Sequence, residues 1–171
     1  MEVHTNLWGP SPTQSLGGRK YYIAFTDDSI HYTMLTILQS KDEALDMYKS
    51  YAVWVYTQHG VRIKHLRSDH GGEYTRGKFT KFLKEQGTKR RLTTYDTPQH
   101  NSVAELLNCR LVEHVHTVLH QSRLPKMLWA EALHFVIWVK NRTLTRALGN
   151  VTPFEKLTRK KPNIAGVPEW G

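Results

Sequence analysis

The order in which strand-like and helix-like segments follow one another constrains the fold of this chain most strongly. Three β-rich segments come first, at 3–8, 20–25 (KYYIAF) and 31–38 (HYTMLTIL). The turn residues 26–29 (TDDS) predict that the second and third segments form an antiparallel hairpin. A helix, a strand, a helix, a strand and further helices are predicted to follow. This order indicates an α/β fold with a mixed sheet, because an all-parallel doubly wound fold would alternate strands and helices throughout.

Capping residues and helical periodicity predict the later elements. Ser40 followed by Asp42 and Glu43 is typical of a helix start, and Gly60 is typical of a helix end. The other predictions are a strand at 61–66, a short helix at 78–86, a strand at 89–94, a turn at 97–100 before a long helix, a helix from Pro125 and a short helix at 153–157.

The sequence becomes polar and rich in proline from Thr143 onward. We therefore expect one main domain at 1–145. Residues 146–171 are predicted to be a C-terminal extension, mostly loop with one short helix.

Charge and composition limit the classes of function. The 171 residues carry a net charge of +9, and such a surface attracts polyanions, so nucleic acid is the leading partner. A basic protein with solvated faces is the alternative at this stage. No apolar run is long enough to cross a bilayer, so no membrane partner is expected. The single cysteine, Cys109, excludes an internal disulfide.

Two acidic residues are candidates for holding divalent metal ions. Asp69 follows a predicted strand and precedes two glycines, and Glu105 projects off the buried stripe of the predicted long helix. Enzymes that cut or join nucleic acid often hold two metal ions with a few carboxylates, and Mg²⁺ prefers such oxygen ligands. Taken singly, each acid is as well explained as a surface carboxylate. The 35 residues that lie between them, and their flanks, favour the functional interpretation.

These flanks resemble the catalytic core of copia-type retrotransposon integrases. Residues 66–74 (LRSDHGGEY) are similar to the motif of the second catalytic Asp in that family, and 95–105 (YDTPQHNSVAE) to the segment that leads to the catalytic Glu. The spacing between the two acids is typical of retroviral-type integrases. Further similar segments are 4–10 (HTNLWGP), 124–126 (LPK), 129–132 (WAEA), 141–142 (NR) and 152–155 (TPFE), so the resemblance covers nearly the whole chain.

The resemblance implies an RNase H-like fold, with a five-stranded sheet of three antiparallel and two parallel strands flanked by helices. It also implies Mg²⁺ or Mn²⁺ at the acidic site, DNA as the substrate, a homodimer and action in the nucleus. The implied reaction is 3′-processing and strand transfer of DNA ends. The expected metal and catalytic positions are Asn6, Asp69 and Glu105, and the expected DNA contacts are Gln99, Asn101, Asn108 and Arg110.

The main departure from the family pattern is Asn6, which stands where the resemblance places the first catalytic Asp. A neutral amide offers one carbonyl oxygen and lowers the formal charge of the site from −3 to −2. We therefore expect weaker metal binding and little or no strand transfer. Ser102, Leu106 and Cys109 also differ from the family pattern.

Three explanations of Asn6 are open at this stage. The chain is a decayed or host-adopted copy, it is an enzyme disabled on purpose, or a neighbouring acid replaces the lost carboxylate. Asp27 and Asp28 are the nearest acids to consider, although they are more simply explained as turn residues.

Alternative functions follow from the same sequence. A host protein could use the fold only to bind nucleic acid or another protein, and a structure-directed nuclease of the RNase H group is a further possibility. The acid spacing and the 101–105 flank favour an integrase over that nuclease. A zinc-binding domain and a DNA-binding tail are not included in these residues, so we expect one domain of a longer protein. His114, His116 and His120 suggest no metal site, because no third ligand accompanies the pair one helical turn apart.

Overall fold

The computed structural model describes the backbone of residues 1–68, 77–92 and 98–165, and the side chains of these residues outside 98–105. The strands are β1 (Glu2–Trp8), β2 (Tyr21–Asp27), β3 (Thr33–Leu38), β4 (His65–Ser68) and β5 (Lys89–Leu92). The α-helices are α1 (Ala44–His59), α3 (Gly77–Glu85), α4 (Pro98–Gln121), α5 (Trp129–Arg142) and α6 (Pro153–Thr158). Short 3-10 helices at Lys41–Glu43, Lys126–Leu128 and Arg146–Leu148 precede α1, α5 and α6.

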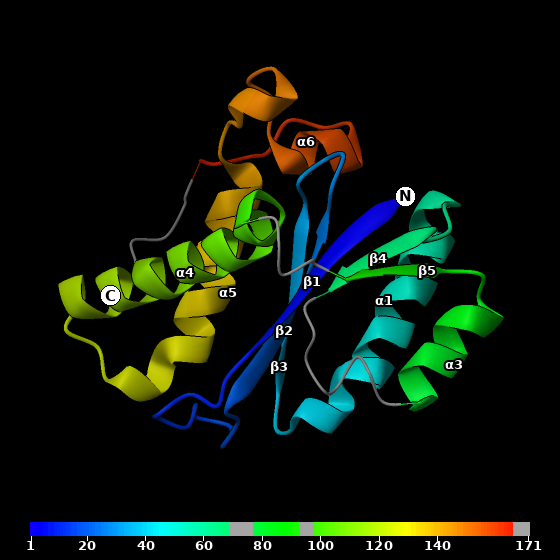
Figure 1. Cartoon of the computed structure of the whole chain (residues 1–171). Coiled ribbons are helices and arrows are strands. Elements are labelled where there is room, and N and C mark those ends of the chain that lie inside the picture. The colour runs from blue at the N-terminus through cyan, green and yellow to red at the C-terminus, as the bar shows by residue number, and fades with distance from the viewer. Residues whose placement is uncertain (69–76, 93–97, 166–171) are drawn as a thin grey trace.

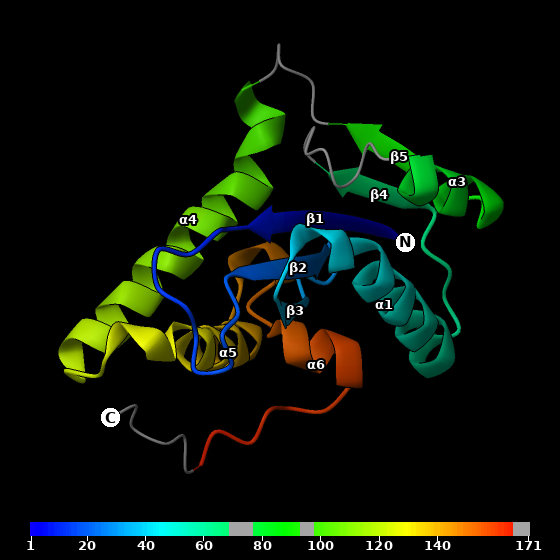
Figure 2. The same ribbon diagram turned by 90° about the horizontal axis from the view of Figure 1, so that it is seen from below.

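The strands form one sheet in the order β3-β2-β1-β4-β5. β1 and β2 are antiparallel, as are β2 and β3, whereas β4 runs parallel to β1 and β5 runs parallel to β4. Helices α1 and α3 cover one face of the sheet, and α4 and α5 cover the other (Figures 1 and 2). The predicted mixed sheet of three antiparallel and two parallel strands is therefore confirmed.

Alternate residues of β1 supply two separate cores. Val3 and Leu7 are buried against α1 and α3, in a cluster that includes Leu66 and Phe79. On the opposite face, Trp8 packs with residues of β2, α4 and α5, in a cluster that includes Tyr22, Leu111, Val115, Trp129 and Leu133. The period of two along a strand thus separates the α1 side of β1 from the α4 side.

The predicted start and end residues enclose one helical segment, in which the 3-10 helix Lys41–Glu43 leads into α1. The Ser40 hydroxyl accepts from the Asp42 N–H, and the Glu43 carboxylate accepts from the Ser40 N–H at 2.8 Å, so a capping box precedes the helix. Gly60 follows the last turn with φ +64°, a left-handed conformation that glycine adopts without a steric cost.

Two predicted boundaries are wrong. The strand predicted from residue 61 begins at His65, which pairs with Glu2 at the start of its parallel partner β1. Before it, the Lys64 N–H donates to the Met1 carbonyl at 2.9 Å, outside the strand. The turn predicted at 97–100 is helical from Pro98 onward, because proline has no N–H and is tolerated in the first turn of a helix. Residues 93–94, predicted to continue the last strand, lie outside the described residues.

The end of α5 holds the edge strand β3 through side-chain amide hydrogen bonds. Asn141 is buried; its Oδ1 accepts from the Thr33 N–H at 3.0 Å, and its Nδ2 donates to the Thr33 carbonyl at 2.8 Å. The neighbouring Arg142 guanidinium lies over the rings of Trp138 and Phe154, at 4.1 and 4.5 Å from their centroids, and so joins α5 to α6. No helix in the described part of the chain has the length and apolar character required to cross a bilayer.

We predict that Asn141→Ala lowers the free energy of unfolding by about 2–4 kcal/mol, because two buried backbone groups of Thr33 lose their partner. Urea denaturation followed by circular dichroism measures the change. The control, Gln58→Ala on the exposed side of α1, should change stability by less than about 0.5 kcal/mol. Equal effects of the two substitutions would contradict this role of Asn141.

Candidate active site

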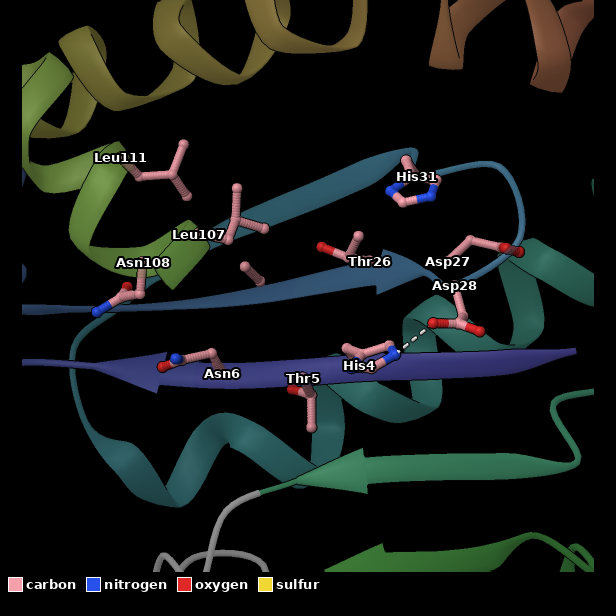
Figure 3. A pocket seen from close by; sticks show the side chains of 11 residues that line it. His4, Thr5, Asn6, Thr26, Asp27, Asp28, His31, Leu107, Asn108 and Leu111 are labelled. Carbon is pink, nitrogen blue, oxygen red and sulfur yellow. Dashed lines mark hydrogen bonds and ion pairs between the residues drawn. The ribbon is translucent and has the colours of Figure 1, made fainter. Parts of the chain in front are cut away.

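Asn6 lies in β1, the central strand of the five-stranded sheet. It pairs with Ala24 of β2, and it shares the α4 side of β1 with His4 and Trp8. Figure 3 shows its side chain in a pocket between β1, β2 and α4. The other lining residues are His4, Thr5, Ala24, Thr26, Asp27, Asp28, His31, Leu107, Asn108 and Leu111.

Helix α4 reaches this pocket through a polar side chain held by β2. The Tyr22 hydroxyl donates to Oδ1 of Asn108, and burial raises the pKa of Tyr22 well above its ordinary value, with a smaller contribution from Cys109. The Tyr22 ring stacks on Trp8, with centroids 5.3 Å apart, and both rings contact Trp129 of α5. An aromatic cluster therefore supports the pocket and sets the position of α4 relative to Asn6.

The other end of the pocket holds a hydrogen-bonded histidine and aspartate that the sequence did not predict. Nε2 of the buried His4 lies 2.7 Å from Oδ1 of Asp28, in the turn between β2 and β3. The neighbouring Asp27 accepts from the backbone N–H groups of Ser29 and Ile30, so its assignment as a turn residue is confirmed. His4 and Asp28 are 24 positions apart in the sequence, and nothing in either flank signals their contact.

The structure describes the surroundings of the two predicted carboxylates in part. β4 is described up to Ser68, beside β1, and Asp69 lies outside the described residues. Glu105 belongs to α4, three residues before Asn108, and positions three apart lie on the same side of a helix. The side chains of Glu105, Gln99 and Asn101 lie outside the described residues.

The structure describes the side chains of the other α4 residues that the sequence singled out. Asn108 lies at the pocket with its oxygen held by Tyr22, and Arg110 is exposed on α4. Leu106 is 48% exposed, as expected for a leucine off the buried stripe. His114, His116 and His120 are exposed helix residues.

The described residues alone do not make a metal centre. Among them, no group of three or more His, Cys, Asp or Glu side chains is positioned to hold an ion. Asn6 could contribute one neutral carbonyl oxygen, and a hard cation such as Mg²⁺ needs anionic oxygens in addition. Asp69 and Glu105 stay the predicted anionic ligands, and both carboxylates lie outside the described residues.

The sequence is similar to segments of known retrotransposon proteins. The chain is 33% identical over 169 residues to the retrovirus-related Pol polyprotein from transposon TNT 1-94 of Nicotiana tabacum, and 29% identical to the one from transposon RE2 of Arabidopsis thaliana. Each match covers 99% of this chain. The chain is therefore similar to one segment of each of these two Pol polyproteins. It spans 13% of the length of the first and 11% of the second.

A solved structure has a similar fold. This chain superposes with a TM-score of 0.68 on a chain of the simian T-cell lymphotropic virus intasome, solved by cryo-electron microscopy in complex with the PP2A regulatory subunit B56 gamma. The match covers 98% of this domain and 57% of that chain at 16% identity. The fold is therefore RNase H-like, as the sequence resemblance implies. No protein-family model matches the chain.

Lys140 of α5 fastens the loop that carries His31 at the rim of the pocket. Its Nζ donates to the His31 carbonyl at 2.7 Å and lies 2.8 Å from the Thr33 hydroxyl. Burial lowers the pKa of Lys140 to about 8. The folded protein therefore disfavours the charged ammonium relative to the unfolded chain, where the ordinary pKa is 10.5.

We predict that Lys140 makes the free energy of unfolding increase as pH rises from about 8 to 10.5. In that range the unfolded chain binds more protons at this position than the folded protein does. Lys140→Met removes this contribution. Urea unfolding of both proteins at several pH values measures it as the difference between their stability profiles. Parallel profiles over this range would contradict the lowered pKa.

Proposed function

We propose that this domain is an integrase-like catalytic core, built for metal-dependent transfer of DNA strands and impaired by Asn6. The observation that carries the proposal is the position of Asn6. It lies on the central strand, on the face that α4 approaches, beside the strand that ends at Ser68. The homology to Pol polyproteins and the fold shared with a retroviral intasome chain support the same reading.

In this proposal Asp69 and Glu105 hold the metal ions together with position 6. Asp69 follows Ser68 in the sequence, and Glu105 lies one helical turn before Asn108, whose side chain is at the pocket. Three elements, β1, β4 and α4, would then each bring one oxygen ligand to the same site. Mg²⁺ or Mn²⁺ would supply a Lewis acid for the attacking and leaving oxygens of a phosphodiester.

Asn6 changes the electrostatics of such a site. An Asp at this position would bring a charged carboxylate that can bridge two ions, whereas the amide brings one neutral oxygen. Asp27 and Asp28 also line the pocket, but Asp27 is held by the backbone of its turn and Asp28 by His4. The geometry therefore does not favour a neighbouring acid as a substitute for the carboxylate that Asn6 lacks.

DNA binding, dimerisation and nuclear action complete the proposal. Gln99, Asn101, Asn108 and Arg110 are proposed to contact the DNA, since α4 carries all four. We propose a homodimer that acts in the nucleus. A second candidate is a host-adopted module that binds nucleic acid or protein without catalysis; it is favoured by the neutral Asn6 in an otherwise intact core.

We predict that Asn6→Asp gains metal-dependent activity on DNA, by at least about tenfold, because it restores one anionic ligand. The measurement uses labelled duplexes for strand transfer and a branched substrate for the reversed reaction, each with Mg²⁺ or Mn²⁺. The original chain should be nearly inactive in both assays.

The matched control is the double variant Asn6→Asp/Asp69→Asn, which has the same net charge as the original chain. It should lose the gained activity if Asp69 is a ligand. If Asn6→Asp stays inactive while the protein is folded and binds DNA, the catalytic proposal fails and the binding module is the better account.

A further inference from the structure

A row of basic side chains continues the face of the sheet that carries Asn6. The register pairs Glu2 with His65 and Lys89, and it pairs His4 with Arg67 and Arg91. Side chains of paired residues in neighbouring strands project to the same face of a sheet. Arg67, Lys89 and Arg91 therefore lie on the α4 side of the sheet, as His4 and Asn6 do, and we call them the β4–β5 basic strip.

The described helices leave this part of the sheet open. α4 and α5 pack over β1, β2 and β3, and the views in Figures 1 and 2 place both helices away from β5. Lys89 and Arg91 are exposed, and Arg67 is partly exposed. This basic strand face is exposed beside the pocket, whereas α4 and α5 pack on the same side of β1, β2 and β3.

Glu2 holds the two arginines in place. Its Oε1 accepts from Nε and Nη2 of Arg67 at 3.1 and 3.0 Å, and its Oε2 accepts from Nη1 of Arg91 at 2.7 Å. The Glu2 carboxylate accepts from three nitrogen atoms of the two guanidinium groups. Since each guanidinium has five N–H groups, further N–H groups remain on both arginines. The guanidinium groups are therefore fixed side by side and keep donors for a second anion.

We infer that the β4–β5 basic strip binds the phosphate backbone of a DNA duplex and guides it toward Asn6. The strip alone carries three positive charges against the one of Glu2, and it runs across two neighbouring strands about 4.8 Å apart. Backbone contacts of this kind position DNA without reading its sequence. The inference rests on the proposed function for the choice of DNA as the partner.

The opposite face offers a matched control. Lys81 and Lys84 are exposed on α3, and that helix packs through Phe79 and Leu83 on the α1 side of the sheet. These lysines are close to the strip in the sequence but belong to the other face. Neutralising them removes the same charge without touching the strip.

The test measures the affinity of the whole chain for a fluorescent 20-base-pair duplex by anisotropy, at several salt concentrations and without divalent metal. Lys89→Gln/Arg91→Gln should weaken binding about tenfold and reduce the slope of log affinity against log salt by up to about 1.8. Lys81→Gln/Lys84→Gln should weaken binding less than about threefold. Lys89→Gln alone, which leaves the Glu2 pairs intact, should reduce the slope by up to about 0.9.

Each outcome decides the inference. An equal loss in the two double variants would overturn it, because only net charge would then matter, and so would unchanged binding of Lys89→Gln and Lys89→Gln/Arg91→Gln. If the original chain does not bind the duplex at all, the proposed function itself fails. If the original chain binds the duplex and the strip variants bind it with the same affinity, the proposed function stands and only the inferred role of the strip in DNA binding is wrong.

Discussion

The pairing of β1 with an antiparallel neighbour on one side and a parallel neighbour on the other is the constraint on which the rest of this structure depends. Because β2 and β4 both hydrogen-bond to it, β1 is buried in the middle of the sheet, and its alternate residues must serve two cores. Its α4 side carries the polar His4 and Asn6, followed by Trp8, which packs against the apolar cluster of α4 and α5. The pocket, the position of α4 and the basic strip on β4 and β5 all follow from that register.

Much of the fold could be predicted from local chemistry. The hairpin of β2 and β3, the Ser40 capping box and the buried stripe of α4 all have short-range signals in the sequence. The two errors have different causes. The start of β4 at His65 is set by its pairing with the distant Glu2, whereas Pro98 starts a helix instead of lying in a turn, since proline is tolerated in the first turn of a helix.

The candidate site was predictable in part, by resemblance. The motif around Asn6 and its position on a strand could be identified from the sequence. The contacts that shape the pocket could not, because Tyr22 with Asn108 and His4 with Asp28 join residues far apart along the chain without any local pattern. The same reason hides the role of Asn141, which is a motif residue in the sequence but holds the β3 edge in the fold.

The central claim is that position 6 belongs to a metal site shared by β1, the end of β4 and α4. Paramagnetic broadening of backbone amide signals by Mn²⁺, in isotope-labelled protein, tests it most directly. The account predicts that Asn6→Asp shows strong broadening centred on residues 4–8, 66–68 and 106–110, and that the original chain shows weaker broadening at the same Mn²⁺ concentration. Broadening centred on His116 and His120, or identical in the two proteins, would contradict the account.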